Sequence, residues 1–187
     1  MIMSRLLMFC LACLISISGY GQFTSRLGRF QVDQVRGCAP FTITIINANV
    51  LHADECTPRK PCLMDFNGSQ SQNRYTYTYP TSVTRSLSVL YQSIGSDDIR
   101  VIVDPNILPL FETSLLGNQV SVRITDTNYD RYAIDFGDGS PIALVAASAS
   151  QIASYTYVSK GIYNISVQGR KLGATNNCGV RVLAVRL

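Results

Sequence analysis

The stretch Ile134-Asp135-Phe136-Gly137-Asp138-Gly139-Ser140-Pro141 decides the fold of this chain. A β-branched, apolar approach leads into two glycines that bracket an aspartate, and a proline follows. Glycine adopts backbone angles that are closed to other residues, while Asp and Pro favour turns. We therefore expect a strand that ends in a tight turn.

Two further segments follow this turn within about thirty residues. Tyr155-Thr156-Tyr157 comes first, and Gly161-Ile162-Tyr163-Asn164-Ile165-Ser166-Val167 comes next. In the second segment apolar and polar residues alternate, which is the period of a half-buried strand. The sequence therefore predicts a β protein organised around this turn.

In this order, the D-F-G-D-G turn, the Y-T-Y strand and the G-x-Y-x-I-x-V strand resemble the signature of polycystic-kidney-disease (PKD) domains. The resemblance covers roughly residues 118–187. It implies a small immunoglobulin-like β-sandwich on an extracellular protein, with the motif residues serving as architecture. Those residues are Asp135, Phe136, Gly137, Asp138, Gly139, Tyr155, Tyr157, Gly161 and Tyr163.

The composition fits a packed, mostly neutral protein. Of 187 residues, 47% are apolar and 15% are charged, so global disorder is not expected. The net charge is only +4. The basic residues are scattered, whereas nucleic-acid binding requires a concentrated basic face. We expect no nucleic-acid partner. Trp is absent, and Tyr, Thr, Val and Ile are plentiful, which favours strands.

The N-terminus is typical of a secretory signal peptide, assigned to residues 1–21. Arg5 is a lone charge, Leu6 to Ile17 is an apolar core, and Ser18-Gly19-Tyr20-Gly21 offers small residues for cleavage. A retained membrane anchor is the alternative, but the run is shorter than the roughly 18–20 residues of a spanning helix. A lipoprotein attached through Cys13 is a second alternative. We expect a secreted or outer-surface protein without a membrane span after cleavage.

Removal of this leader leaves four cysteines, Cys38, Cys56, Cys62 and Cys178. An even number in an exported chain predicts disulfides, and four cysteines permit three pairings. The turn-like residues 57–61 favour a bond between Cys56 and Cys62. Cys38 and Cys178 then either bond across the two halves of the chain or stay unpaired.

The chain contains a second, weaker copy of the signature. Asp65-Phe66 lies over Asp135-Phe136 at an offset of 70, and Tyr77-Thr78-Tyr79 lies over Tyr155-Thr156-Tyr157 at an offset of 78. The strand that starts at Phe41 matches the strand that starts at Val120 at an offset of 79. The strand that starts at Ile99 matches the strand that starts at Val180 at an offset of 81. Because the offsets change only between strands, we predict two tandem immunoglobulin-like (PKD-type) sandwiches, over residues 26–104 and 105–187.

The predicted strands have alternating or apolar character and are bounded by turn residues. Two prolines, Pro105 and Pro109, stiffen the connector between the copies. The first copy has Arg85 where the second has Tyr163. The predicted strands are Arg29–Val32, Phe41–Ile46, Leu63–Phe66, Arg74–Tyr79, Arg85–Tyr91 and Ile99–Val103, then Leu110–Glu112, Gln119–Thr125, Tyr132–Phe136, Ser154–Tyr157, Tyr163–Gln168 and Val180–Arg186; residues 142–150 are predicted to form a loop.

Catalysis is not expected. His52 is the only histidine and lies in a predicted loop, and neither a G-x-S-x-G elbow nor a P-loop is present. Asp65 and Asp135 belong to different modules, so they do not form the carboxylate pair of a glycosidase. We expect neither a catalytic residue nor a resident metal.

A group of four aspartates and a group of three tyrosines each allow two interpretations, one functional and one structural. Calcium could use the hard oxygens of Asp126, Asp130, Asp135 and Asp138, although turn aspartates usually accept bonds from their own amides. Tyr75, Tyr77 and Tyr79 share one face of a strand. They either form an aromatic surface for glycan or protein, or fill the core with hydroxyls at its rim.

A second resemblance concerns the opening of the first copy. Residues 37–44, Gly-Cys-Ala-Pro-Phe-Thr-Ile-Thr, resemble PKD modules of large surface proteins from gliding bacteria. The resemblance implies a non-catalytic cell-surface protein that contacts other surface proteins or extracellular polysaccharide, or that acts as a spacer, with adhesion or gliding as context. The alternative is an accessory polysaccharide-binding module of a secreted hydrolase system.

Overall fold

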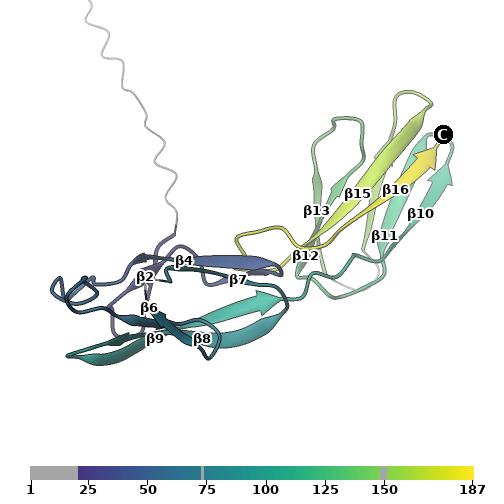
Figure 1. The fold of residues 1–187 in the computed structure, drawn as a ribbon. Coiled ribbons are helices and arrows are strands. Elements are labelled where there is room, and N and C mark those ends of the chain that lie inside the picture. The colour runs from purple at the N-terminus through teal and green to yellow at the C-terminus, as the bar shows by residue number, and fades with distance from the viewer. Residues whose placement is uncertain (1–20, 73, 148–150) are drawn as a thin grey trace, which may run out of the picture.

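The computed structural model describes residues 21–72, 74–147 and 151–187. All the regular structure in these residues is β, arranged as two sandwiches in tandem (Figure 1), which confirms the predicted all-β fold class. The predicted signal peptide, residues 1–21, lies outside the described residues except for Gly21. Within the described ranges, no helix has the length and apolarity needed to cross a membrane.

The first module comprises nine strands in two sheets. One sheet has the order β1-β2-β4-β7 and the other β3-β9-β8-β5-β6. All neighbours are antiparallel except β3, which runs parallel to β9. The strands are β1 (Phe23–Thr24), β2 (Gln31–Val32), β3 (Arg36–Cys38), β4 (Phe41–Asn47), β5 (Leu63–Asp65), β6 (Gln70–Gln72), β7 (Thr76–Tyr79), β8 (Val83–Tyr91) and β9 (Gly95–Asp104).

The second module comprises seven antiparallel strands. Sheet β10-β11-β14 packs against sheet β13-β12-β15-β16, which is the strand order of an immunoglobulin-like sandwich. The strands are β10 (Phe111–Leu116), β11 (Gln119–Ile124), β12 (Arg131–Asp135), β13 (Ala143–Ala146), β14 (Ile152–Thr156), β15 (Ile162–Arg170) and β16 (Val180–Arg186).

Each module has its own hydrophobic core, built from the inward positions of alternating strands. In the first, β4 contributes Phe41, Ile43 and Ile45, and the opposite sheet contributes Leu87 and Val89 among others. In the second, β11 contributes Val120, Val122 and Ile124 against Ile134, Ile165 and Val167. The second core also contains Cys38, which comes from the first module.

Strand pairing corrects two of the offsets that relate the copies. Asp65 pairs with Ser88 and Asp135 with Ser166, which agrees with the offsets of 70 and 78. Leu87 pairs with Ile99, however, and Ile165 with Leu183, so the last strands correspond at an offset of 84 (183 minus 99) rather than 81. Similarly, Tyr77 pairs with Ile43 and Tyr155 with Val120, an offset of 77 rather than 79.

The shift from 81 to 84 matters because an odd shift exchanges the two faces of a strand. An offset of 81 places buried Val101 over Val182, whose side chain is 58% exposed. The sequence comparison was misled because β16 is apolar on both faces. Strand ends also differ from prediction: β10 continues to Leu116, and residues 142–150, predicted as a loop, contain β13.

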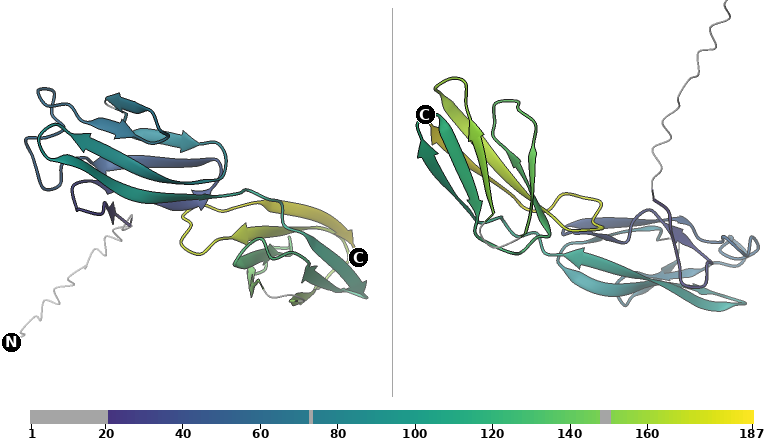
Figure 2. Two further views of the ribbon diagram at one scale, coloured as in Figure 1. Left: turned by 90° about the horizontal axis from the view of Figure 1, so that it is seen from below. Right: turned by 180° about the vertical axis from the view of Figure 1, so that it is seen from behind.

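The two modules meet end to end at an angle (Figures 1 and 2). The last strand of the first module, β9, ends at Asp104, and residues 105–110 form the connector to β10. The loop between β15 and β16, residues 171–179, reaches back to the first module, where Thr175 donates its amide to the carbonyl oxygen of Arg36 at 3.2 Å.

Candidate functional site

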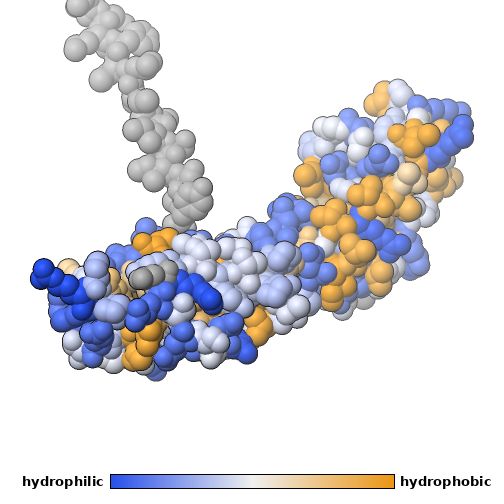
Figure 3. Space-filling view, in the orientation of Figure 1, coloured by the Kyte–Doolittle hydropathy of each residue, from blue (hydrophilic) through white to orange (hydrophobic). Residues whose placement is uncertain are grey.

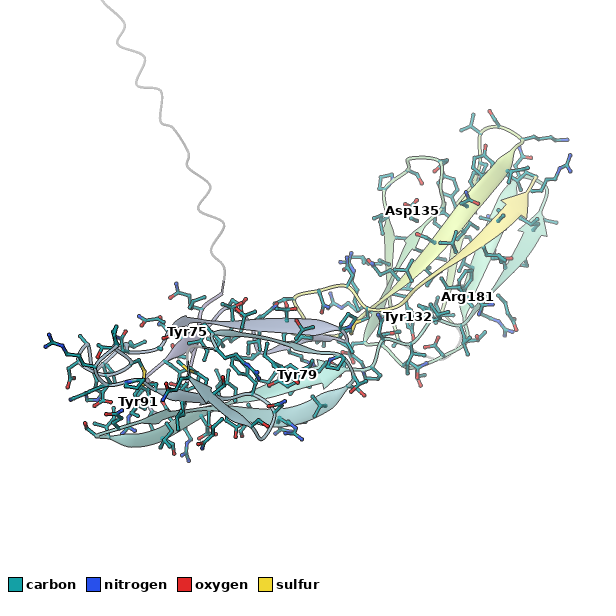
Figure 4. The ribbon with its side chains drawn as sticks, in the orientation of Figure 1. Tyr75, Tyr79, Tyr91, Tyr132, Asp135 and Arg181 are labelled. Atoms are coloured by element: carbon teal, nitrogen blue, oxygen red, sulfur yellow. A yellow bond between two sulfur atoms is a disulfide. The ribbon has the colours of Figure 1, made fainter. Side chains whose placement is uncertain are left out.

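The D-F-G-D-G turn of the second module is held by its own aspartates. Asp135 Oδ1 accepts the Gly137 amide at 2.8 Å, and Asp138 Oδ1 accepts the Ser140 amide at 3.0 Å. The Tyr155 hydroxyl donates to Asp138 Oδ2. This bond, together with the donors at Ser140, holds the pKa of Asp138 below its usual value. Asp135 lies at the end of β12 (Figure 4).

Tyrosines brace this turn in the same way in both modules. Tyr157 donates its hydroxyl to the Phe136 carbonyl at 2.8 Å, and Tyr79 donates to the Phe66 carbonyl at 2.7 Å. Phe136 stacks on Tyr155 with ring centres 4.8 Å apart, and Phe66 stacks on Tyr77 at 5.6 Å. The Y-T-Y strand therefore supports the turn that precedes it, which matches an architectural role.

The aromatic ladder predicted at Tyr75, Tyr77 and Tyr79 is graded in burial. Tyr79 is buried, Tyr77 is half-buried and Tyr75 is exposed. Burial raises the pKa of Tyr79 and of Tyr157 to about 12, so both hydroxyls remain protonated donors at neutral pH. Tyr79 thus belongs to the core, Tyr77 packs at its edge, and Tyr75 remains accessible.

Removing either buried hydroxyl should destabilise the protein measurably. Tyr79→Phe and Tyr157→Phe each leave a backbone carbonyl unpaired, which we expect to cost about 1–2 kcal/mol of unfolding free energy. Urea unfolding followed by tyrosine fluorescence measures this loss. The exposed Tyr75→Phe is the control and should cost almost nothing; equal losses at all three positions would contradict the brace.

Glycines 137 and 139 make a matched test of the turn. Both adopt left-handed φ angles, +79° and +81°. A Cβ at Gly137 would lie 2.4 Å from the backbone oxygen of Asn164, whereas a Cβ at Gly139 meets no atom within 4 Å. We expect Gly139→Ala to cost about 1 kcal/mol from φ alone. Gly137→Ala should cost about 3 kcal/mol, because the backbone must also move. Thermal unfolding of both variants checks this order.

The two modules differ at the position six residues after the Y-T-Y segment, which is Arg85 in the first module and Tyr163 in the second. In the second, Tyr163 stacks on Tyr157 with ring centres 3.9 Å apart, and its ring packs over Gly161. In the first, Arg85 replaces this tyrosine, and its guanidinium lies beside Gly68. A hollow of about 310 Å³ opens there, lined by Arg85, Asn67 and Tyr77 among others.

The four aspartates considered for calcium serve backbone and tyrosine donors. Asp126 accepts the Asn128 amide at 2.9 Å and the Tyr132 hydroxyl. Asp130 accepts the Leu172 amide at 2.8 Å. Among the residues that the structure describes, no three His, Cys, Asp or Glu side chains converge into a group that could hold a metal ion. These carboxylates therefore organise loops.

The joint between the modules is clamped covalently. Cys38 and Cys178, 140 residues apart in sequence, form a disulfide that is buried within the second core. Beside it, the Asn176 side chain pairs with the Cys38 backbone: Oδ1 accepts the amide at 2.7 Å, and Nδ2 donates to the carbonyl at 2.8 Å. A Cβ at Gly37 would lie 2.1 Å from the buried Phe41 ring and 2.5 Å from Asn176 Oδ1, so glycine lets both side chains approach the backbone here.

Tyr129 fastens the connector from the other side. Its hydroxyl donates to the Ile107 carbonyl and accepts the Ile107 amide at 2.8 Å. The Gly179 amide also donates to this hydroxyl at 3.3 Å. A single buried side chain therefore joins the connector to the start of β16. The prolines expected to stiffen the joint are accompanied by a disulfide and by this network.

The second disulfide joins Cys56 to Cys62 and closes a short loop. Directly before that loop, Glu55 is buried, and its Oε2 accepts the Gln92 amide at 3.1 Å. Hydrogen bonds from Ser93 and from the Gln92 amide lower the pKa of Glu55. His52 also precedes the loop, and its backbone oxygen accepts the Glu55 amide at 3.0 Å. These hydrogen bonds hold the segment that leads into the loop.

Three residues that shape the molecule were missed by sequence reasoning, namely Asn176, Tyr129 and Asp97. In the sequence, the only mark of Asn176 is that it lies two residues before Cys178. Asp97 is 1% exposed, and its carboxylate accepts the Ser25 hydroxyl at 2.5 Å. Each acts on a partner that is remote in sequence, so no local pattern marks it.

Comparisons with known proteins assign no family. No protein-family model matches the chain, and no curated protein matches it. Among solved structures, the crystal structure of selenomethionine-substituted chicken interferon gamma receptor alpha chain is similar at 10% identity and a TM-score of 0.41. The alignment covers 90% of this chain and 98% of that chain. At this level the similarity assigns neither family nor function.

Proposed function

We propose that this chain is a non-catalytic exported protein that contacts other proteins at the cell surface through two PKD-like sandwiches held at one angle. The observation that carries the proposal is the Cys38–Cys178 disulfide. Disulfides persist in oxidising compartments outside the cytosol. This one also adds a second covalent link between two domains that the chain joins through residues 105–110, and a fixed angle suits a protein that presents surfaces or sets a spacing.

Location and processing test this proposal. Antibodies against the second module should label intact, unpermeabilised producing cells or precipitate the protein from the culture medium. Mass spectrometry should find the chain beginning near Gln22, with all four remaining cysteines oxidised. Recovery of a reduced, full-length chain from the cytosol would overturn the proposal.

A second candidate function is favoured by the hollow beside Arg85. A guanidinium recognises a carboxylate, and a tyrosine ring packs against the face of a sugar. The second module fills the same place with Tyr163. Acidic polysaccharide is therefore the ligand class that would fit the accessory-module alternative.

Retention on polyuronate gels distinguishes the two functions. If the hollow binds acidic sugar, the protein is retained and Arg85→Ala abolishes retention, whereas Arg100→Ala, an exposed arginine on the neighbouring strand, does not. If the wild-type protein passes unretained, or if both variants weaken retention equally, the acidic-sugar candidate fails and protein contact remains.

A further inference from the structure

The outer edge of β16 carries unpaired backbone groups. Leu187 donates its amide to Gly161 at 3.0 Å, and Gly179 accepts the Gly169 amide at 2.9 Å. Because bonded and non-bonded pairs alternate in an antiparallel ladder, the odd-numbered residues of β16 bond to β15. The amides and carbonyls of Val180, Val182, Ala184 and Arg186 therefore point away from β15. In the described part of the chain, no strand pairs with this edge.

The side chains along this edge are unusually apolar for their exposure. Val180 is 42% exposed, Val182 58% and Leu183 39%. Val182 lies on the outer face of the sheet, opposite Ser166, and Leu183 lies on the core face, opposite Ile165. In Figure 3, apolar residues gather on the second module, while the first module is mostly polar in the same view. Exposed apolar surface of this kind marks interaction sites.

The equivalent edge of the first module is covered by its own chain. The Ile102 amide donates to Val35, and Asp104 accepts the Ala39 amide, both at 2.9 Å, because β3 lies against β9. Nearer the other end of β9, the Asp98 carbonyl accepts the Arg26 amide at 2.9 Å. In the corrected alignment of the two copies, Asp98 corresponds to Val182 and Ile102 to Arg186.

The second module lacks both elements of that cover. Its first strand, β10, pairs with β11 along its whole length up to the turn at Gly117 and Asn118, so it does not reach β16. In the first module, Asp97 holds residues 25–29, which cover one end of the β9 edge. In the second module, Arg181 stands at the position of Asp97, and its guanidinium lies 5.8 Å from the ring centre of Phe111. The β16 edge is therefore open because β10 pairs with β11 and because Arg181 stands where the first module has Asp97.

We propose that a second copy of this chain occupies the edge, with two β16 strands antiparallel about a two-fold axis at Leu183. This register pairs Val182 with Ala184, Arg181 with Val185 and Val180 with Arg186 of the partner copy. Both arginines then face apolar residues, and no like charges meet directly. Leu183 meets its own equivalent on the axis.

This self-complementarity is why a second copy fits the edge better than an unrelated strand. A two-fold interface requires that one surface match itself, and the sequence of β16 does so in this register. Pairing also closes an edge that would otherwise be open to aggregation. Because β16 runs from the joint to the far end of the second module (Figure 1), antiparallel pairing places the two first modules at opposite ends of the dimer. The inference does not depend on the proposed function.

Proline variants test the pairing with a matched control. Ala184→Pro removes an amide that faces the open edge and leaves the bonds to β15 intact. Ala146→Pro does the same at the other edge of this sheet, because Ala147, its neighbour, bonds to Asp130 and alternation turns the Ala146 amide outward. Sedimentation equilibrium should show that the wild-type protein dimerises, that Ala184→Pro raises the dissociation constant at least about tenfold, and that Ala146→Pro does not.

Cysteine variants test the register without a proline. Directly opposed residues of a non-bonded antiparallel pair have Cα atoms about 4.5 Å apart, within the range of a disulfide. After mild oxidation of the folded protein, Leu183→Cys should form a covalent dimer, and Val182→Cys, which faces Ala184 of the partner copy, should not. A wild-type protein that stays monomeric up to about 1 mM would overturn the proposal. So would dimers that Ala184→Pro leaves intact or that cross-link equally at both positions.

Discussion

Replacing Cys38 and Cys178 together by alanine should give the largest loss of stability among single-site or paired changes in this chain. The bond closes a loop with a sequence separation of 140 residues. In the chain-entropy model, a loop of this length stabilises the folded state by about 5 kcal/mol. Both half-cystines are buried, so alanine also leaves a small cavity in the second core.

The short disulfide is the matched control. Cys56→Ala with Cys62→Ala opens a loop with a separation of only 6 residues, for which the same model gives about 2 kcal/mol. Guanidinium unfolding of both double variants measures the difference. Small-angle scattering should show a wider range of distances between the modules only when the long bond is removed. A smaller loss for the long bond than for the short one would contradict the role of the clamp.

Asp97→Asn should cost about 3 kcal/mol of unfolding free energy at neutral pH, as much as we expect for Gly137→Ala. The Asp97 carboxylate accepts the Ser25 hydroxyl and the amides of Leu27, Arg29 and Asp98 at 2.5–3.1 Å. Burial alone would raise the pKa of Asp97, but these four donors outweigh it and lower the pKa. An asparagine directs an NH2 group at donors, so at least one amide loses its acceptor.

This carboxylate also predicts a pH dependence with a definite sign. Because the pKa of Asp97 is lower in the folded than in the unfolded state, its contribution is complete above the unfolded value near 3.9. The contribution is lost as the pH falls through the lower, folded value. The free energy of unfolding of the wild-type protein should therefore fall more steeply below about pH 4 than that of Asp97→Asn.

Asp98 is the control for both measurements. It pairs with Arg26 at 3.2 Å, but the Arg26 side chain is 71% exposed, so Asp98→Asn should cost less than about 1 kcal/mol. Hydrogen exchange gives the local readout: the amides of Leu27 and Arg29 should lose protection in Asp97→Asn and keep it in Asp98→Asn. Equal effects of the two substitutions would show that the buried carboxylate is not the anchor.

Local sequence patterns were enough to identify the β class and the turn. The glycines at 137 and 139 require left-handed backbone, and the alternation in β4 and β15 assigns one face to a core. The second D-F pair and the second Y-T-Y revealed the repeat. These features depend on residues close in sequence, and a single chain displays them directly.

The register of β16, the joint between the modules and the open edge of β16 depend on contacts between residues that are distant in sequence. β16 carries apolar residues on both faces, so its pattern could not say which face is buried. Only its pairing with β15 fixed how the last strands of the two copies correspond. In the same way, Asp97 is an anchor because it accepts the Ser25 hydroxyl, and Asn176 supports the joint because it accepts the Cys38 amide. Burial and hydrogen bonding between remote segments are decided when the sheets pack, because the free energy comes from contacts that no local pattern contains.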